Sequence, residues 1–232
     1  AIAGGHSILL HQRKEKAHVS LHELAVREVD NTGNIRTWPS EDIILRYLLK
    51  TLPSMVQSAP LRVLELGAGM CGVAGFALAA ACSPLVLNQV TITDGNEMCI
   101  QNLQQMCQIN KKHNRLVNHV DVKLLQWSRE LKSPVGLKYD VIFASDCLFF
   151  EKYHDDLLHT IDINLTESGT CIMLQPSRGG SLERFCTKAK LIFSVQLFPS
   201  RYDDLVNAQV HSSDPRFDPD IHHPQLLVLK RL

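Results

Sequence analysis

From residue 61 onward, short apolar runs alternate with longer segments of helical periodicity. Short runs rich in Val, Ile and Leu, bounded by turn residues, predict buried strands. We predict strands at Leu61–Leu66, Val90–Thr93, Val120–Leu125, Tyr139–Ser145, Thr170–Gln175, Leu191–Phe198 and Leu226–Lys230. The intervening patterns predict helices at Val73–Cys82, Glu97–Lys112, Tyr153–Leu165 and Ser181–Lys190. Buried strands separated by helices are typical of a parallel sheet with helices on both faces.

The last two predicted strands lack a convincing helix between them. The segment from Asp214 to Pro219 contains two prolines and no helical periodicity. Parallel strands need a crossover connection, usually a helix. We therefore predict a seven-stranded Rossmann-like α/β sheet whose final strand pair is antiparallel.

The first sixty residues have a different pattern. Two partly alternating runs, Val19 to Asp30 and Ile35 to Trp38, flank the turn residues Asn31-Thr32-Gly33-Asn34 and predict a β-hairpin. Pro39-Ser40-Glu41-Asp42 then begins a helix through about Lys50, because acidic residues favour the first helical turn. We expect residues 1–60 to form an extension packed on a core domain of residues 61–232.

Composition narrows the classes of partner. The formal charge is zero, so no long-range field favours nucleic acid or anionic membrane as the main partner. Seven cysteines form no CxxC pair, which argues against zinc and for a reducing compartment. No apolar run is long enough to cross a bilayer, and the first residues lack the order of a signal peptide. We expect a cytoplasmic and nuclear monomer without a metal.

The segment Glu65-Leu66-Gly67-Ala68-Gly69 carries the strongest chemical signal. It joins a buried strand to an Ala-rich helix, and glycines there let backbone approach a nucleotide-like ligand. The glycine spacing alone does not separate a dinucleotide from S-adenosyl-L-methionine. Glu65 favours S-adenosyl-L-methionine, because a carboxylate there suits the amino group of its methionine part or an ordered water near that group.

Other candidate residues follow the later strands, at the edge where ligands bind in open α/β sheets. Asp94 can accept both ribose hydroxyls, or it can cap the next helix. Trp127 can stack on adenine or pack in the core. Asp146 emerges from a fully apolar strand and is either a structural cap or a functional carboxylate.

Taken together, these segments resemble the seven-strand protein lysine methyltransferases of class I, and within them the members directed at calmodulin. The resemblance covers nearly the whole chain from about residue 18. It rests on the Trp38 and Glu65–Met70 segments, Thr93–Glu97, Trp127, Asp146–Phe149, Pro176–Gly179 and His223–Leu227. Cys71 departs from the pattern, since many relatives carry glycine at this position.

The resemblance implies a set of site residues. It implies S-adenosyl-L-methionine contacts at Trp38, Glu65, Gly67, Gly69, Asp94, Trp127 and Ser145. It places Asp146 and Phe149, the ends of a D-x-x-[FY] signature, beside the acceptor lysine. We expect Phe150 to line the substrate channel and Arg178 to contact the acidic substrate calmodulin.

Two rival interpretations remain at this level. A methyltransferase fold can bind cofactor or partner without turnover, although the cofactor residues here look intact. A nicotinamide-dependent oxidoreductase is disfavoured by Glu65 and Trp127, and by the lack of a Tyr-x-x-x-Lys pair. A different protein lysine is the alternative to calmodulin as the acceptor.

Overall fold

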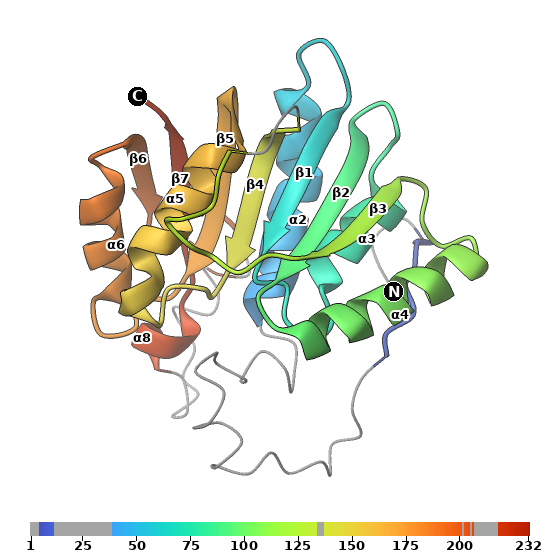
Figure 1. The fold of residues 1–232 in the computed structure, drawn as a ribbon, viewed down its shortest axis with the longest axis horizontal. Helices are drawn as coiled ribbons and strands as arrows, with labels where there is room; N and C mark the ends of the chain where they lie inside the picture. The colour runs from blue at the N-terminus through green and yellow to red at the C-terminus, as the bar shows by residue number, and fades with distance from the viewer. Residues whose placement is uncertain (1–4, 12–38, 134–136, 201, 205, 207–217) are drawn as a thin grey trace.

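The chain folds around one seven-stranded sheet (Figure 1). The computed structural model describes residues 5–11, 39–133, 137–200, 202–204, 206 and 218–232. The strand order is β3-β2-β1-β4-β5-β7-β6, and β7 runs antiparallel to both of its neighbours. The predicted seven-stranded sheet with an antiparallel final pair is confirmed.

The strand bounds place the predicted site residues at strand ends. The strands are β1 (Leu61–Leu66), β2 (Leu87–Asp94), β3 (His119–Leu124), β4 (Tyr139–Ser145), β5 (Leu165–Gln175), β6 (Phe193–Phe198) and β7 (Gln225–Arg231). The parallel strands β1, β2 and β4 end at the same edge, the lower one in Figure 1. Strand order reverses between β1 and β4, which is where ligands bind in such sheets.

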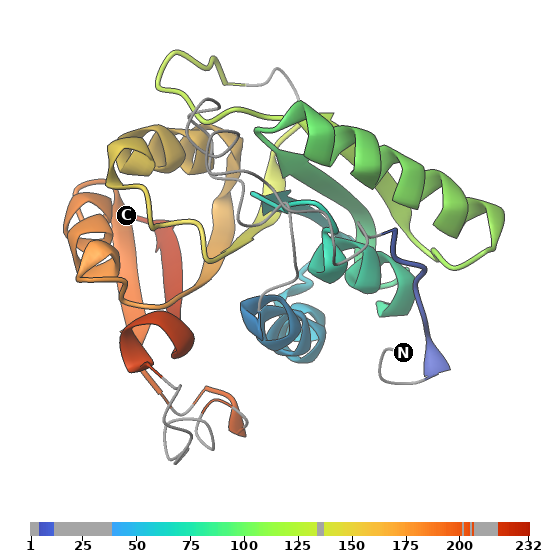
Figure 2. The ribbon, with the colours of Figure 1, turned by 90° about the horizontal axis from the view of Figure 1, so that it is seen from below.

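Helices cover both faces of the sheet. The helices are α2 (Pro39–Met55), α3 (Val73–Ala81), α4 (Glu97–Lys112), the 3₁₀ turn η3 (Glu151–Tyr153), α5 (His154–Asn164), α6 (Ser181–Ala189) and α8 (Pro219–His222). Apolar residues of α2, α3 and α4 share one core cluster with one face of the strands. Residues of α5 and α6 share a second cluster with the other face. Figure 2 shows α5 and α6 across the strands from α2.

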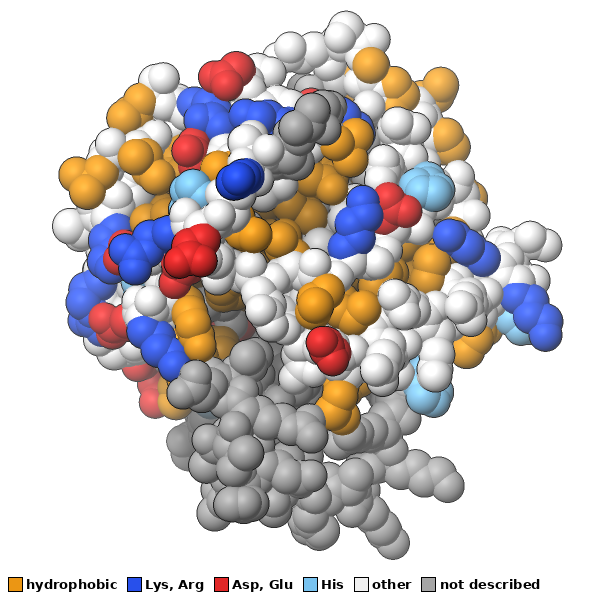
Figure 3. Space-filling model, viewed as in Figure 1, with side chains coloured by type: hydrophobic (Ala, Val, Ile, Leu, Met, Phe, Trp, Pro, Cys, Tyr) orange, Lys and Arg blue, Asp and Glu red, His pale blue; other side chains and the backbone are white. Residues whose placement is uncertain are grey.

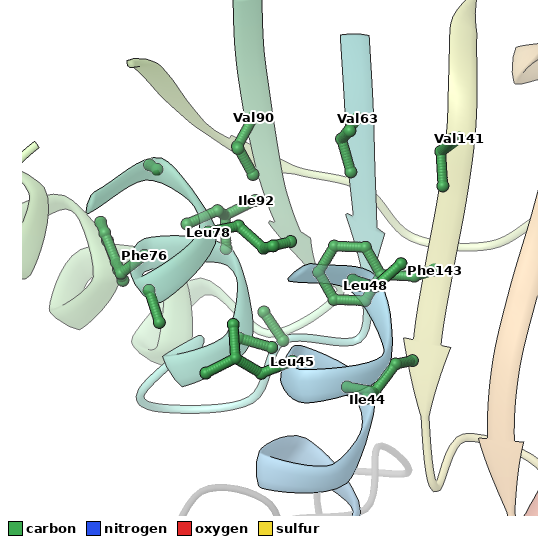
Figure 4. Close-up of a cluster of buried hydrophobic side chains, with 14 of the residues drawn as sticks. Ile44, Leu45, Leu48, Val63, Phe76, Leu78, Val90, Ile92, Val141 and Phe143 are labelled. Carbon is green, nitrogen blue, oxygen red and sulfur yellow. The ribbon is translucent and has the colours of Figure 1, made fainter. Parts of the chain in front are cut away.

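Helix α2 packs against the sheet and contributes side chains to its hydrophobic core. Ile44, Leu48 and Leu52 repeat every four residues and are fully buried. Figure 4 shows Ile44 and Leu48 beside Phe143 of β4, with Val63 of β1 above them. This apolar stripe carries the helix past the predicted end near Lys50 to Met55, through Pro53 in its last turn.

Other helix and strand boundaries differ from the predicted ones, at places where the polarity of the sequence and the pairing of strands in the structure disagree. Strand β5 begins at Leu165, which pairs with Tyr139, although its first half is polar and partly exposed. Strand β6 begins at Phe193 because Leu191 and Ile192 lie in the turn after α6, with Leu191 80% exposed. Helix α5 starts at His154, and Leu165, its predicted last residue, belongs to the next strand.

The predicted hairpin and Trp38 lie outside the described residues. The seven cysteines, Cys71, Cys82, Cys99, Cys107, Cys147, Cys171 and Cys186, are all free and buried. None of the described helices is both long and apolar enough to span a membrane.

Candidate functional site

The glycine-rich turn after β1 is fastened to the end of β2. The Ala68 N–H donates to the Thr93 carbonyl at 2.9 Å, and the Gly69 N–H donates to Asp94 Oδ2 at 2.8 Å. Gly67, Gly69 and Gly72 all have positive φ, between 50° and 66°, a region that favours glycine. The local sequence therefore fixes a bare backbone loop between two strand ends.

Asp94 is buried, and both of its oxygens contact backbone. Oδ1 accepts from the Asn96 N–H at 2.8 Å, while the Asn96 side chain caps α4 by accepting from the Met98 N–H. Asn96, and not Asp94, is thus the cap of the following helix. Burial raises the pKa of Asp94, and the N–H groups of Asn96 and Gly69 oppose that rise. The Cys99 side chain and the Gly95 N–H lower the pKa of the same carboxyl further.

Glu65 is a buried carboxylate one residue before the end of β1. Its side chain is only 3% exposed, and Oε2 has no hydrogen-bond partner among the described residues. Burial raises the pKa of Glu65 well above its usual range, with further increases from Glu41 and Asp94, whereas the Gly75 N–H lowers it. An unpartnered carboxylate oxygen in this setting is suited to a cationic amino group.

Gly67, directly after β1, lies close to residues that follow β3 and β4. A Cβ at this position would lie 2.7 Å from Cys147 Sγ and 3.3 Å from Cζ2 of Trp127. Trp127 is half-buried, and part of its side chain packs against the core cluster of α5 and α6. Burial raises the pKa of the Cys147 thiol well above its usual range, which excludes this cysteine as a nucleophile at neutral pH.

The segment after β4, residues Asp146–Phe149, is named the β4 loop below. Its backbone is held from several sides: the Asp146 N–H donates to the Leu174 carbonyl at 2.9 Å. Gln175 Oε1 accepts from the N–H groups of Cys147 and Leu148 at 2.8 and 3.2 Å. The Leu148 carbonyl contacts His154 Nε2 at 3.0 Å and also accepts from the Ser181 hydroxyl.

The Asp146 carboxylate is held by an arginine. Arg178 Nε donates to Oδ1 at 2.9 Å and its terminal nitrogen donates to Oδ2 at 2.5 Å. Asp146 follows Ser145, the last residue of β4, and has a positive φ of 53°. Arg178, expected to contact substrate, is therefore engaged with the β4 loop.

Aromatic rings flank this loop. The Phe149 and Phe150 ring centroids are 4.6 Å apart, and Phe150 lies edge-on to Tyr153 at 6.2 Å. Phe150 is 37% exposed, so an apolar surface faces solvent next to Asp146. Such a surface can shield an alkyl side chain from water.

The structure brings most of the predicted residues to one sheet edge. Glu65, Gly67, Gly69, Asp94 and Trp127 surround the turn after β1, and Ser145, Asp146 and Phe149 lie at the end of β4. Sequence reasoning missed Gln175 and Gly75. Gln175 carries a weak signal, a lone amide ending an apolar strand, whereas nothing in the sequence marks Gly75.

The adjacent histidines before β7 contact nearby backbone. His222 Nδ1 accepts from the Asp218 N–H at 2.9 Å, and His223 Nε2 lies 2.6 Å from the Pro199 carbonyl oxygen. Within the described ranges, no group of three His, Cys, Asp or Glu residues is arranged to hold a metal ion.

Charges on the α5 and α6 face are interspersed (Figure 3). Arg184 pairs with Glu151 at 2.5 Å, and Lys188 pairs with Asp155 at 2.9 Å. Lys111, in the last turn of α4, donates to the Val120 carbonyl, and Arg115, after the helix, donates to the Ser7 hydroxyl. These basic side chains thus have partners within the chain itself.

The family profile and the similar proteins that match this chain agree with one another. Residues 18–191 match the profile of a family described as "Lysine methyltransferase". A calmodulin-lysine N-methyltransferase of Arabidopsis thaliana is 32% identical over 208 residues, which are 87% of this chain and 65% of that protein. The protein-lysine methyltransferase METTL21E of Bos taurus is 26% identical over 192 residues, 80% of this chain and 63% of its own. The chain thus spans a little under two thirds of these relatives.

Solved structures support the fold. A methyltransferase from Pyrococcus furiosus superposes with a TM-score of 0.54 at 15% identity, covering 90% of this chain and 92% of its own. At this identity the likeness establishes the fold alone, the seven-stranded class I methyltransferase architecture.

Proposed function

The chain belongs to the lysine methyltransferase family, and on that premise we propose that it methylates the ε-amine of a protein lysine, with calmodulin as the substrate. The observation that carries the proposal is the meeting of two sites at one sheet edge. A glycine turn with Glu65 and Asp94 adjoins the β4 loop, which presents Asp146 and Phe149. Calmodulin is supported by the Arabidopsis relative and by the sequence resemblance.

The first of these sites suits S-adenosyl-L-methionine, the cofactor of this family. Glu65 would hold the amino group, because its Oε2 is buried without a partner. Asp94 would accept the ribose hydroxyls, and Trp127 would stack on adenine beside Gly67. The backbone of Gly67 and Gly69 leaves room for the ligand, Ser145 lies at the adjoining strand end, and Trp38 stays a prediction from the resemblance.

When bound, this cofactor supplies a methyl group on a sulfonium, which an amine nitrogen can attack in line. The chain contributes mainly position, and holding two reactants in line supplies several kcal/mol, by general estimates about 7–11 kcal/mol at most. A free lysine has a pKa of about 10.4, so the acceptor site must favour the neutral amine. Phe149 and Phe150 would do so by keeping water away from the amine.

The decisive experiment is transfer of a radiolabelled methyl group to unmethylated calmodulin. We expect label on calmodulin, and replacing its lysines one at a time by arginine should identify a single acceptor. The control is the Asp94→Asn variant, which should bind S-adenosyl-L-methionine weakly and label little at the same cofactor concentration.

Other results would separate the rival functions. Label on a different protein of a cell lysate, with none on calmodulin, would retain the enzyme and replace the substrate. Cofactor binding without label on any protein would indicate a binding module. Calorimetric binding of NAD in place of S-adenosyl-L-methionine would contradict the proposal.

A further inference from the structure

The ion pair between Arg178 and Asp146 is a feature that the methyl transfer proposed above does not by itself require. Two hydrogen bonds, 2.9 and 2.5 Å long, join the guanidinium to both oxygens of the same carboxylate. The side chains are only 22% and 9% exposed. A bidentate, largely buried pair is strong and fixed in orientation, and its net charge is zero.

The backbone around Arg178 is held in a special conformation. Arg178 has a positive φ of 48°, and its N–H donates to the Asp220 carbonyl at 3.0 Å. The next N–H, of Gly179, donates to the Asp220 carboxylate at 2.9 and 2.8 Å. A non-glycine residue rarely adopts positive φ without support. The connection between β5 and α6 is thus tied to α8 where it carries the guanidinium to Asp146.

A carboxylate beside the acceptor amine creates a problem for methyl transfer. An opposite charge at about 4–6 Å favours the charged form of a group and shifts its pKa by about 1–3 units. An uncompensated Asp146 would therefore hold an incoming lysine as the ammonium ion, which has no lone pair. A guanidinium bound to the same carboxylate offsets most of the effect of its negative charge on the lysine amine.

Apart from Arg178, the titratable groups described around the β4 loop do not supply the compensating charge. The Cys147 thiol is held in its neutral form by burial, and burial lowers the pKa of His154, so its imidazole is neutral at pH 7.5. The nearby charged side chains have other contacts: Glu151 with Arg184, Glu183 with Ser177, Lys188 with Asp155 and Asp220 with Gly179. Lys152 Nζ lies over the Tyr153 ring, 4.8 Å from its centroid. Glu65 and Asp94, on the cofactor side, are acids and supply no positive charge.

We propose that Arg178 is a charge-compensating, positioning residue of the acceptor site, whose guanidinium offsets the Asp146 carboxylate so that the substrate lysine enters as the neutral amine. This inference rests on the proposed function. It reassigns Arg178 from contact with an acidic substrate surface to control of the protonation state of the acceptor.

The test is the Arg178→Met variant, which keeps much of the side-chain volume and removes the charge. The pH dependence of kcat reports groups in the enzyme–substrate complex. We expect its ascending limb to move up by about one to three pH units, so that kcat at pH 7.5 falls about tenfold or more. The probe is unmethylated calmodulin, or a peptide around whichever lysine the wild-type enzyme labels.

A second measurement does not depend on turnover. With S-adenosylhomocysteine bound, no methyl group is available, and calorimetry reports substrate binding alone. At pH 7.5 the Arg178→Met variant should bind the substrate more tightly, by about the same factor by which its kcat falls, because the bare Asp146 attracts the ammonium form. A purely structural role of Arg178 would weaken binding and lower kcat by the same factor at every pH.

Arg184→Met is the matched control. Arg184 makes the same bidentate contact with Glu151, at 2.8 and 2.5 Å, but on an exposed face with side chains 51% and 49% exposed. Its kcat profile and substrate affinity should match those of the wild type. Arg178→Lys keeps the charge, so its profile should stay at the wild-type pH even if kcat drops.

The double variant Asp146→Asn with Arg178→Met removes both charges and should return the ascending limb toward the wild-type position. An active wild-type enzyme whose Arg178→Met variant shows an unshifted profile and no gain in substrate affinity would overturn this inference alone. A wild-type protein that labels no lysine at all would overturn the proposed function along with it. Circular dichroism on each variant identifies any that does not fold. If Arg178→Met does not fold, the pH profiles of kcat of Arg178→Lys and of the double variant are compared instead, and both should keep the ascending limb near the wild-type position.

Discussion

The Glu65 carboxylate occupies the space that a side chain at Gly75 would need: a Cβ at residue 75 would lie 2.2 Å from Glu65 Oε2. Gly75 is in the first turn of α3, and its N–H hydrogen-bonds the same carboxyl. The glycine therefore gives the buried carboxylate both room and a donor at a helix N-terminus.

Gly75→Ala should reverse the usual effect of alanine in a helix. Alanine normally stabilises a helix interior by roughly 0.5–1 kcal/mol over glycine, whereas overpacking a core costs about 1–3 kcal/mol. We expect lower stability by urea denaturation and weaker calorimetric binding of S-adenosyl-L-methionine, since Glu65 must move. Gly95→Ala is the stability control, because its Cβ would meet nothing closer than 3.7 Å. Unchanged cofactor affinity in Gly75→Ala would contradict the placement of Glu65 in the cofactor site.

Asp94→Asn should separate cofactor binding from helix capping. Loss of the charge weakens hydrogen bonds that are worth about 1.5–3 kcal/mol, so we expect cofactor affinity to fall by roughly tenfold to a hundredfold. The matched control is Asn96→Ala, which removes the α4 cap and should lower stability by about 1 kcal/mol. Calorimetry and urea denaturation of both variants check this. Equal losses of affinity in the two variants would count against a ribose contact.

Glu65→Gln should stabilise the ligand-free protein in a pH-dependent way. Because the folded state raises the pKa of Glu65 above the unfolded value of about 4.3, protonation favours the folded chain. That contribution is complete below the unfolded pKa and is lost as pH rises through the folded pKa. Glutamine mimics the protonated form, so the variant should exceed the wild type in stability most at pH 8, and the gap should narrow toward pH 5.

The measurement is urea denaturation of the ligand-free protein across that pH range. Glu167→Gln removes a carboxylate that is 87% exposed and should change stability little at any pH. Cofactor affinity of Glu65→Gln should fall even where its stability rises. A stability gap that does not vary with pH would show that Glu65 is not the titrating group.

Gln175→Met should impair turnover with cofactor affinity retained. The substitution leaves the buried N–H groups of Cys147 and Leu148 without their acceptor, at a cost of about 1–3 kcal/mol for each unsatisfied group. The β4 loop then loses its fixed position, and kcat on the labelled substrate should drop. Gln196→Met, at an exposed position of β6, is the control and should behave like the wild type. A Gln175→Met enzyme with unchanged kcat would mean that the loop is positioned by its other contacts.

The sequence by itself determined the sheet and the ends of its strands. Runs such as Val141 to Ala144 and Ile172 to Leu174 must be buried, and short buried runs between helices have few arrangements other than a covered parallel sheet. The edge at which strands end follows from that topology, so Glu65, Asp94 and Asp146 were predictable as neighbours of one site. Leu191 and the polar start of β5 were misassigned because pairing, not polarity, sets where a strand begins.

Only the tertiary structure decided what each of these side chains contacts. Three contacts join positions 10 to 32 residues apart: Gly75 with the Glu65 carboxylate, the Gln175 amide with the backbone of the β4 loop, and the Arg178 guanidinium with Asp146. Local pattern specifies which face of an element is buried, but long-range hydrogen bonds depend on register and packing across the whole sheet. The glycine-rich turn Glu65–Gly69 thus indicated a cofactor from sequence, and the fold decided how the Glu65 carboxylate is held.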